Sequence, residues 1–483
     1  MDWLGISTIV VAVLNFLMLL VMIFVERKKT QSIMSWLFIM TILPIGGFII
    51  YLLAGSGLSI RTRRMFKRRK IYAHDYLGYI ENIEVLKDPS LKETLGKNVD
   101  TIKFYTSYKS LPLPYNKTEV FLDGTSKVNA LEKDLLAAKK SINIEYYIFH
   151  NDEVGKRIMN ILCQKSREGV KVKLIFDSVG CLGAPRRFFR KLKKAGGEVA
   201  EFFPPFGYIR LMNLKVNYRN HRKIVVIDGT VAYTGGVNIR DDHMGKKKKL
   251  SPWRDTHIRI EGSGAYGLQN VFFNDWRYCK KDQTPAEVLV KKGYFPKAKR
   301  EGDVTLQIVT SGPDDEVQRI KEGFVKMIAN AKERVYIQTP YFVPDDVFMT
   351  ALNLAVRSGI DVRIMLPAKP DRKWVHLVTL SFAEDAVKNG VKVYLYNGFL
   401  HSKTMIIDDE ILSVGTSNID NRSFELNFEV QTILYSKRLN KEYEEAFLND
   451  MKNCCVADEK YFKDKNIIAK VGKAFFRLLS PLL

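Results

Sequence analysis

Long apolar stretches dominate the start of the chain. Residues Leu4–Val25 contain only three polar side chains, and these 22 residues suffice to cross a bilayer core, which takes about 20. A second apolar run, Ile33–Leu58, is interrupted by Pro44 and by Gly46 and Gly47, which membrane helices tolerate. The pattern predicts a membrane-spanning helical hairpin. A kinked or partly re-entrant second segment is also compatible with the proline and the glycines.

The charged residues that flank these runs predict their orientation. The first run follows Met1-Asp2-Trp3 and ends in Glu26-Arg-Lys-Lys29, which is unlike a cleaved signal peptide. The segment Arg61–Lys70 has seven basic residues in ten, against three in the loop at 27–29. The positive-inside rule therefore places both termini, and the chain that follows, in the cytoplasm. The same basic cluster should touch anionic headgroups.

From residue 116 onward, short apolar runs alternate with helical segments, and the whole order occurs twice. Residues 331–338 match 138–145, residues 357–365 match 167–175, and residues 389–394 match 196–200. Near-continuous apolar strands separated by helices are typical of a sheet that is covered on both faces. The sequence therefore predicts a duplicated α/β unit, with halves that pack about an approximate two-fold axis.

One polar pattern, His-x-Lys-x4-Asp, stands once in each half. The two copies are His221, Lys223 and Asp228, and His401, Lys403 and Asp408. Alternate residues of a strand point to the same face, so each histidine should share a face with its lysine. An imidazole beside an ammonium suits a phosphate, because lysine neutralises the oxygens while histidine attacks phosphorus or protonates a leaving group. The six residues are the predicted catalytic set.

Other polar residues have predicted supporting roles. Asp228 and Asp408 lie at an odd offset from their histidines, so we expect them near the strand-ending turn as structural supports rather than proton carriers. A glycine-bearing turn after each motif ends in Asn238 or Asn418, which would bind phosphate oxygens together with the lysines. A nucleophilic imidazole also needs a carboxylate on its other nitrogen. The candidates are Asp255 for His221 and Glu429 for His401.

Composition narrows the class of partner. The formal net charge is +23, from 76 Lys and Arg against 53 Asp and Glu, which favours nucleic acid or an acidic membrane surface. The apolar runs favour the membrane. Five cysteines, an odd number without a C-x-x-C pair, indicate free thiols rather than disulfides or a zinc site. The lysines can neutralise phosphate and no Asp/Glu/His ligand cluster is evident, so no metal or other cofactor is expected.

The doubled motif resembles that of the phospholipase D superfamily, whose members carry two His-x-Lys-x4-Asp motifs at one active site. Within it, Tyr218–Lys223, Trp253–His257, Thr339–Asp345 and the membrane segment Trp36–Leu53 are similar to bacterial cardiolipin synthases. The resemblance implies phospholipase D-like α/β-sandwich halves that bring both histidines together. The expected divisions are a two-helix membrane anchor at 1–58, a basic connector at 59–115, halves at 116–295 and 296–455, and an amphipathic tail at 456–483.

The resemblance also implies an activity. Two phosphatidylglycerols would give cardiolipin and glycerol through a phosphatidyl-histidine, with His221 as nucleophile and His401 as acid and base by analogy, since the residues themselves do not distinguish these roles. The alternatives are a phospholipase D that releases phosphatidic acid, a nuclease, and a non-catalytic membrane scaffold. The expected setting is the bacterial cell membrane, as a multi-pass protein. Its expected partners are phosphatidylglycerol and anionic lipid, not nucleic acid; the sequence indicates no oligomeric state.

Overall fold

The computed structural model describes residues 3–25, 30–51, 55, 64–67, 70, 96–204, 217–463 and 477. Most of the predicted basic connector, and the predicted tail beyond Lys463 except Arg477, lie outside the described residues. Within the described ranges, no helix combines the length and the apolar character that crossing a membrane requires. The membrane-spanning part of the predicted hairpin therefore stays a prediction.

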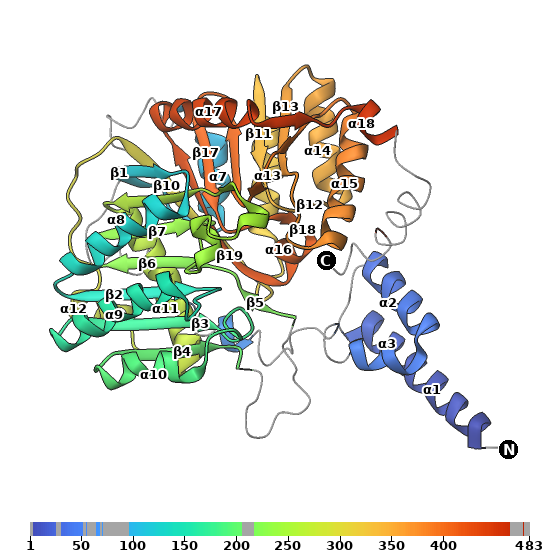
Figure 1. The fold of residues 1–483 in the computed structure, drawn as a ribbon, viewed down its shortest axis with the longest axis horizontal. Helices are drawn as coiled ribbons and strands as arrows, with labels where there is room; N and C mark the ends of the chain where they lie inside the picture. The colour runs from blue at the N-terminus through green and yellow to red at the C-terminus, as the bar shows by residue number, and fades with distance from the viewer. Residues whose placement is uncertain are drawn as a thin grey trace.

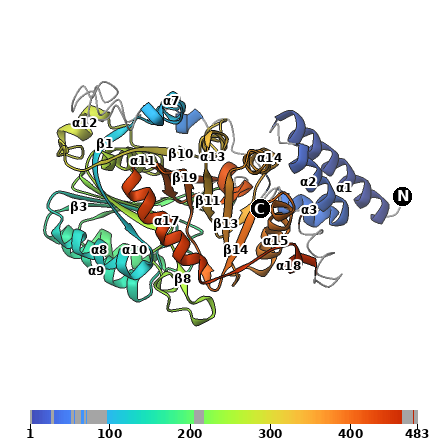
Figure 2. The same cartoon turned by 90° about the horizontal axis from the view of Figure 1, so that it is seen from above.

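The N-terminal unit consists of α1 (Trp3–Leu20), α2 (Thr30–Ile42) and α3 (Pro44–Ile50), with a π-helical turn at Val21–Val25. These helices lie to one side of the rest of the chain in both views (Figures 1 and 2). Met22, Trp36, Met40 and Tyr51 form their small core. The second apolar run is divided at Pro44, which stands in the first turn of α3, where its missing N–H costs no helical hydrogen bond.

The remaining elements form two halves. The first half contains β1 (Leu113–Phe121), α8 (Gly124–Ala137), β2 (Ser141–Tyr146), α9 (Glu153–Arg167), β3 (Lys171–Asp177), α10 (Arg186–Lys194), β4 (Glu198–Phe202), β5 (Arg219–Asn220), β6 (Lys223–Ile227), β7 (Val231–Gly235), β8 (Trp253–Arg254), β9 (His257–Glu261), α11 (Gly264–Lys280) and α12 (Ala286–Lys291). A preceding helix, α7 (Val99–Ser107), packs on the second half.

The second half contains β10 (Val304–Ser311), α13 (Arg319–Asn330), β11 (Arg334–Gln338), β12 (Phe342–Val343), α14 (Asp346–Arg357), β13 (Asp361–Pro367), α15 (Lys373–Lys388), β14 (Lys392–Tyr396), β15 (Phe399–Leu400), β16 (Thr404–Ile407), β17 (Ile411–Gly415), β18 (Ile419–Asp420), α16 (Asn421–Glu425), β19 (Asn427–Tyr435), α17 (Lys437–Met451), β20 (Cys454–Val456) and α18 (Glu459–Lys463).

A single mixed sheet runs through both halves (Figure 1). The first half has the strand order β1-β9-β7-β6-β2-β3-β4, and the second has β10-β19-β17-β16-β11-β13-β14. The halves meet where β1 pairs antiparallel with β10. Read outward from that pair, the two orders are equivalent strand by strand. The predicted duplication of an α/β unit is therefore confirmed.

Both faces of the sheet are covered, as the apolar strands predict. Along β6, Ile224 and Val226 face a central core that α11 and α17 share, whereas Val225 and Ile227 face an outer core under α8, α9 and α10. Helices α13, α14 and α15 cover the corresponding outer face of the second half. Figure 2 shows α17 lying across the strands. The central core is thus common to both halves and holds them against each other.

The two motifs enter their strands in a way that the sequence did not predict. His221 lies between β5 and β6, and His401 lies between β15 and β16, so neither histidine is a strand residue. Strand β5 pairs with β19 of the second half, and β15 pairs with β8 of the first half. At the histidine, each motif leaves a short strand that pairs with the other half and enters a strand in the sheet of its own half. Strict alternation is interrupted at that crossing.

The two motif aspartates close the same kind of turn in both halves. Asp228 follows β6 and accepts hydrogen bonds from the backbone N–H groups of residues 139–141, at 2.7–2.9 Å. Asp408 follows β16 and accepts from those of residues 332–334, at 2.8–3.1 Å. Both have positive φ, 52° and 48°, which aspartate tolerates better than most residues. They tie each turn to the start of the neighbouring strand, as the predicted supports.

Replacing Asp408 by alanine should lower the free energy of unfolding by about 2–3 kcal/mol, because several backbone donors lose a charged acceptor. Asp408→Asn should lose less, since asparagine keeps an acceptor oxygen and tolerates positive φ. The matched control is Asp409→Ala, whose exposed ion pair with Arg334 should contribute less than about 1 kcal/mol. Chemical denaturation of the three variants measures these differences. Equal losses at positions 408 and 409 would contradict the structural role.

Candidate active site

His221 is held by a carboxylate from the opposite half. Its backbone N–H donates to the carbonyl of Phe428 at 2.9 Å, which fixes the residue against β19. Its Nδ1 lies 2.9 and 3.0 Å from the two carboxylate oxygens of Glu429. An ionised carboxylate can only accept, so Nδ1 carries the hydrogen and Nε2 keeps its lone pair. The ring therefore presents a free nitrogen.

His401 is held in the same way, in the reverse direction. Its backbone N–H donates to the carbonyl of Arg254 at 2.7 Å, and its Nδ1 lies 2.8 Å from Asp255 Oδ2. The predicted pairing of Asp255 with His221 and of Glu429 with His401 is therefore wrong. The two carboxylates are exchanged between the halves, because β5 runs beside β19 and β15 runs beside β8.

The two motif lysines lie beside their histidines and are deeply buried. Lys223 Nζ donates to the carbonyl of His221 at 2.7 Å, and Lys403 Nζ donates to that of His401 at 2.5 Å. Burial lowers the pKa of Lys223 to about 7 and that of Lys403 to about 8, although the nearby carboxylates oppose the shift. Both lysines therefore lose a proton more readily than an exposed lysine does.

The two motifs lie near each other, because a Cβ on Gly236, in the turn after the first motif, would lie 3.0 Å from the carbonyl oxygen of His401. Burial lowers the pKa of His221 to about 4, and Lys403 from the other motif contributes to this lowering. Burial and Lys403 also hold the pKa of His401 well below its usual value. Asp255 and Glu429 each act on both lysines. Because each histidine is also held by a carboxylate of the other half, both motifs lie at the junction of the halves; that they form one catalytic pocket stays a prediction.

Each supporting carboxylate is kept ionised by further donors. Burial alone would raise the pKa of Glu429, but His221 and Lys223 hold it below its usual value. The Thr416 hydroxyl donates to Glu429 Oε2 at 2.5 Å, and Asn427 Nδ2 donates to Oε1 at 3.1 Å. Burial would likewise raise the pKa of Asp255, but His401 and His243 keep it well below its usual value.

The two predicted phosphate-binding asparagines differ. Asn238 is engaged by protein groups, since its Oδ1 accepts from the Ile148 N–H at 3.3 Å and its Nδ2 lies 3.2 Å from His243 Nε2. Asn418 Oδ1 is buried and has no hydrogen-bond partner within the described residues, while its side chain donates to Asp420. The structure brings both residues to the site, but their binding of phosphate stays a prediction.

Sequence reasoning missed three residues at this site. Tyr147 packs edge-on against His221, with ring centroids 4.8 Å apart, and its ring lies 5.6 Å from Lys223 Nζ. Thr416 supports Glu429, and His243 lies beside Asp255. Thr416 was visible inside the turn before Asn418, and Tyr147 at the end of a predicted strand. His243 carried no signal beyond being one of seven histidines.

One group of possible metal ligands does occur among the described residues, contrary to the sequence expectation. It consists of His243, Asp255 and His401, whose candidate ligand atoms lie within 4.8 Å of one another. Asp255 Oδ2 is 2.8 Å from His401 Nδ1 and 3.5 Å from His243 Nδ1. The hydrogen bond of His401 to Asp255, with His243 Nδ1 facing the same oxygen, accounts for this arrangement.

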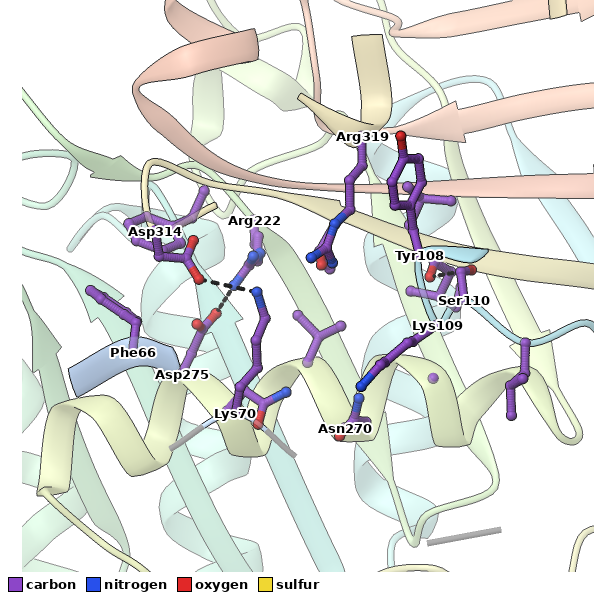
Figure 3. Close-up of a pocket in the computed structure, with 18 of the residues that line it drawn as sticks. Phe66, Lys70, Tyr108, Lys109, Ser110, Arg222, Asn270, Asp275, Asp314 and Arg319 are labelled. Carbon is purple, nitrogen blue, oxygen red and sulfur yellow. Dashed lines mark hydrogen bonds and ion pairs between the residues drawn. The ribbon is translucent and has the colours of Figure 1, made fainter. Parts of the chain in front are cut away.

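A cavity of about 70 Å³ lies beside Arg222 of the first motif (Figure 3). Arg222, between the motif histidine and lysine, points into it, pairs with Asp275 at 2.5 Å and donates to the carbonyl of Glu429 at 3.1 Å. Lys70 from the N-terminal segment enters the same cavity and pairs with Asp314 and Asp315 at 3.1 and 2.9 Å. Lys70 therefore binds carboxylates, and the prediction that it would contact lipid headgroups is wrong for this residue.

The segment that carries Lys70 is also anchored by an aromatic side chain. Phe66 is buried and stacks on Tyr278 with a centroid separation of 4.0 Å, and it lies 5.0 Å from the ring of Phe428. Phe428 directly precedes Glu429, the residue that holds His221. The N-terminal segment thus packs against β19, the strand that carries Glu429, and no sequence pattern predicted this contact.

Comparisons with known proteins agree with this geometry. The family model described as "Cardiolipin synthase, PLD-like domain" matches residues 131–250 and 324–451, and a "Phospholipase_D-nuclease N-terminal" model matches residues 13–56. The chain is 41% identical over 480 residues to a cardiolipin synthase of Listeria innocua, covering 98% of each chain. It is 39% identical over 477 residues to the major cardiolipin synthase ClsA of Bacillus subtilis, again covering 98% of each.

Two solved structures share the fold at low identity. The phosphatidylserine synthase of Haemophilus influenzae superposes with a TM-score of 0.62 at 14% identity, over 80% of this chain and 100% of that one. The polyphosphate kinase of Porphyromonas gingivalis gives 0.50 at 12% identity, over 75% of this chain and 52% of that one. These likenesses concern the fold alone. From the matched domain model and the full-length relatives, the chain belongs to the cardiolipin synthase family of the phospholipase D superfamily.

Proposed function

We propose that the chain transfers a phosphatidyl group from one phosphatidylglycerol to the terminal hydroxyl of another, giving cardiolipin and glycerol. The observation that carries this proposal is the exchanged support of two histidines, each with Nδ1 on a carboxylate of the other half. That arrangement leaves two Nε2 atoms available in one buried site, flanked by two lysines. Such a site suits substitution at a phosphodiester, where one nitrogen attacks and the other moves protons.

The first step forms a covalent intermediate. Nε2 of His221 attacks phosphorus, the bond from phosphorus to the glycerol oxygen breaks, and His401 gives its proton to the departing oxygen. The negative charge of the bound phosphodiester offsets the lowering of the His401 pKa that burial and Lys403 cause, and so favours loading of that proton. Lys223, Lys403 and Asn418 would hold the non-bridging oxygens during this step.

The second step restores the enzyme. The terminal hydroxyl of a second phosphatidylglycerol loses its proton to His401 while its oxygen attacks phosphorus. The bond from phosphorus to His221 then breaks, cardiolipin leaves, and both histidines return to their starting state. A lipid acceptor competes with water here, because burial of the site limits access by water and a membrane surface concentrates the lipid.

The same proposal covers the position of the protein. The N-terminal helices would anchor the chain in the bacterial cell membrane as a multi-pass hairpin, with both α/β halves on the cytoplasmic side. We keep the divisions at residues 58, 115, 295 and 455 as part of this proposal. Support comes from the apolar runs at the start of the chain and from the match to an N-terminal model at residues 13–56.

Product analysis tests the reaction directly. The purified full-length protein, given phosphatidylglycerol in mixed micelles, should produce cardiolipin and glycerol in equal amounts. Phosphatidic acid without cardiolipin would overturn the proposal in favour of hydrolysis. Incubation with single-stranded and double-stranded DNA serves as the parallel assay for a nuclease, and we expect no cleavage.

Removing either histidine should nearly abolish turnover. His221→Ala and His401→Ala should each lower kcat by at least about a thousandfold, because the two rings act as one unit. The double variant should therefore be little slower than either single variant. If His221 is the nucleophile, His401→Ala that is quenched with denaturant at neutral to alkaline pH, where the P–N bond survives, should retain a small phosphatidyl-enzyme fraction that His221→Ala cannot form. Losses that multiply in the double variant would contradict a shared site.

The pH dependence follows from the buried lysines. Lys223 must be protonated to neutralise phosphate, so kcat/KM should fall as the pH rises through about 7 to 8, the pKa values of Lys223 and Lys403. His221 must be neutral to attack, so on its account activity is lost only as the pH falls through about 4. Bound phosphate raises the lysine pKa values, so the alkaline fall in kcat should occur at higher pH than that in kcat/KM. Lys403→Arg, which stays charged, should lose part of the alkaline fall.

A further inference from the structure

His243 lies beside the acid/base histidine without being part of either motif. It belongs to a short 3-10 helix, Asp241–Met244, and only 4% of its surface is exposed. Its Nδ1 is 3.5 Å from Asp255 Oδ2, the same oxygen that binds His401 Nδ1 at 2.8 Å. Its ring packs edge-on against His401, with centroids 5.0 Å apart, and lies 4.4 Å from the ring of Trp253. One carboxylate oxygen thus stands between two imidazoles.

The neighbours of His243 favour one tautomer. The amide Nδ2 of Asn238 lies 3.2 Å from Nε2, and an amide nitrogen can only donate, so Nε2 must accept. The hydrogen then sits on Nδ1 and points to the Asp255 carboxylate. The opposite tautomer would set two donors against each other at Nε2 and a lone pair against the carboxylate at Nδ1. Its single gain would be the Asn238 backbone N–H, 3.4 Å from Nδ1.

A comparison of the two halves shows why a threonine cannot support Asp255 as Thr416 supports Glu429. Asp255, just before β9, is the counterpart of Glu429 on β19, and Gly236 is the counterpart of Thr416 in the turn after the motif. The Thr416 hydroxyl donates to Glu429 at 2.5 Å. Gly236 has no hydroxyl, and a Cβ there would lie 1.9 Å from Asp255 Oδ1. The first half therefore cannot use a threonine at this position. Asp255 Oδ1 instead accepts from the backbone N–H of Thr256 at 2.8 Å, and the imidazole of His243 faces the other oxygen, Oδ2.

We propose that His243 is a positioning residue for His401, donating from Nδ1 to Asp255 and so fixing the carboxylate that orients the acid/base ring. This inference rests on the proposed function, in which His401 moves the protons. His243 itself touches no reacting atom. By sharing Oδ2 with His401, it also draws charge from the carboxylate, which makes His401 release its proton more readily.

The charged and titratable groups around His243 come from several elements. Asp255 and His257 flank it from the segment that leads into β9, Lys223 comes from β6, and His401 and Lys403 come from the second motif. Asp152, at the start of α9, binds the backbone N–H of Asp241 at 2.8 Å and anchors the 3-10 helix. Burial and the two lysines lower the pKa of His243, so the ring is neutral when it donates.

Two substitutions at position 243 separate positioning from packing. His243→Leu fills the space but removes the donor, whereas His243→Asn places an amide N–H where Nδ1 stood. In the full-length protein, we expect His243→Leu to lower kcat by about tenfold to a hundredfold, with KM little changed. We expect His243→Asn to recover most of that loss. The matched control is His150→Leu, a half-buried histidine of the same half that should leave both constants unchanged.

The pH profile gives the second readout. The second step needs a neutral His401, so activity falls as the pH drops through its pKa. Without the His243 donor, Asp255 attracts the His401 proton more strongly, and this acid limb should move to higher pH in His243→Leu but not in His243→Asn. Wild-type kinetics in His243→Leu would overturn the proposal. So would equal losses in both variants, or an unshifted acid limb.

The assay is arranged so that this proposal can fail independently of the proposed function. Turnover is scored as loss of phosphatidylglycerol, whichever acceptor is used, and thermal unfolding midpoints identify variants that lose activity through misfolding. A wild-type protein that consumes the lipid but makes no cardiolipin would end the proposed function. The dependence of that consumption on His243 would still stand or fall by the Leu and Asn pair.

Discussion

The exchange of carboxylates between the halves is the constraint on which the rest of the structure depends. His221 belongs to the first half and is oriented by Glu429 of the second, while His401 of the second is oriented by Asp255 of the first. Neither half therefore supplies the carboxylate that orients its own histidine. The antiparallel junction of β1 with β10 and the central core shared by α11 and α17 keep the halves in register, so these two hydrogen bonds can form.

Burial gives this exchange its chemical value and also its cost. In a dry interior, an unpaired ammonium or carboxylate is expensive, and each group here is tolerated only because groups of opposite charge surround it. The same environment brings the lysine pKa values to about 7 and 8. A bound phosphodiester adds a negative charge beside the two lysines and so favours their protonated forms. Substrate binding and protonation of the two lysines therefore favour each other.

The sequence predicted the parts of this molecule that follow from local pattern. The doubled motif and matching strands predicted the repeated sheet order, and the odd offset of Asp228 and Asp408 predicted that they would leave the motif face. The carboxylate pairing could not be predicted, because it depends on which backbone each motif runs beside at β5 and β15. His243 was equally invisible, since its role arises from the absence of a side chain at Gly236, where a Cβ would collide with the Asp255 carboxylate.

The docking of Phe66 and Lys70 bears on how the reaction centre is carried. Because the Lys70 ion pairs are largely buried, removing Lys70 would be costly for Asp314, whereas Asp315 would keep its ion pair with Arg319 at 3.0 Å. Phe66 also packs against Phe428, the residue directly before Glu429. The chain is therefore held against the second half at Phe66 and Lys70. Displacement of Phe66 would therefore disturb β19, whose Glu429 orients His221.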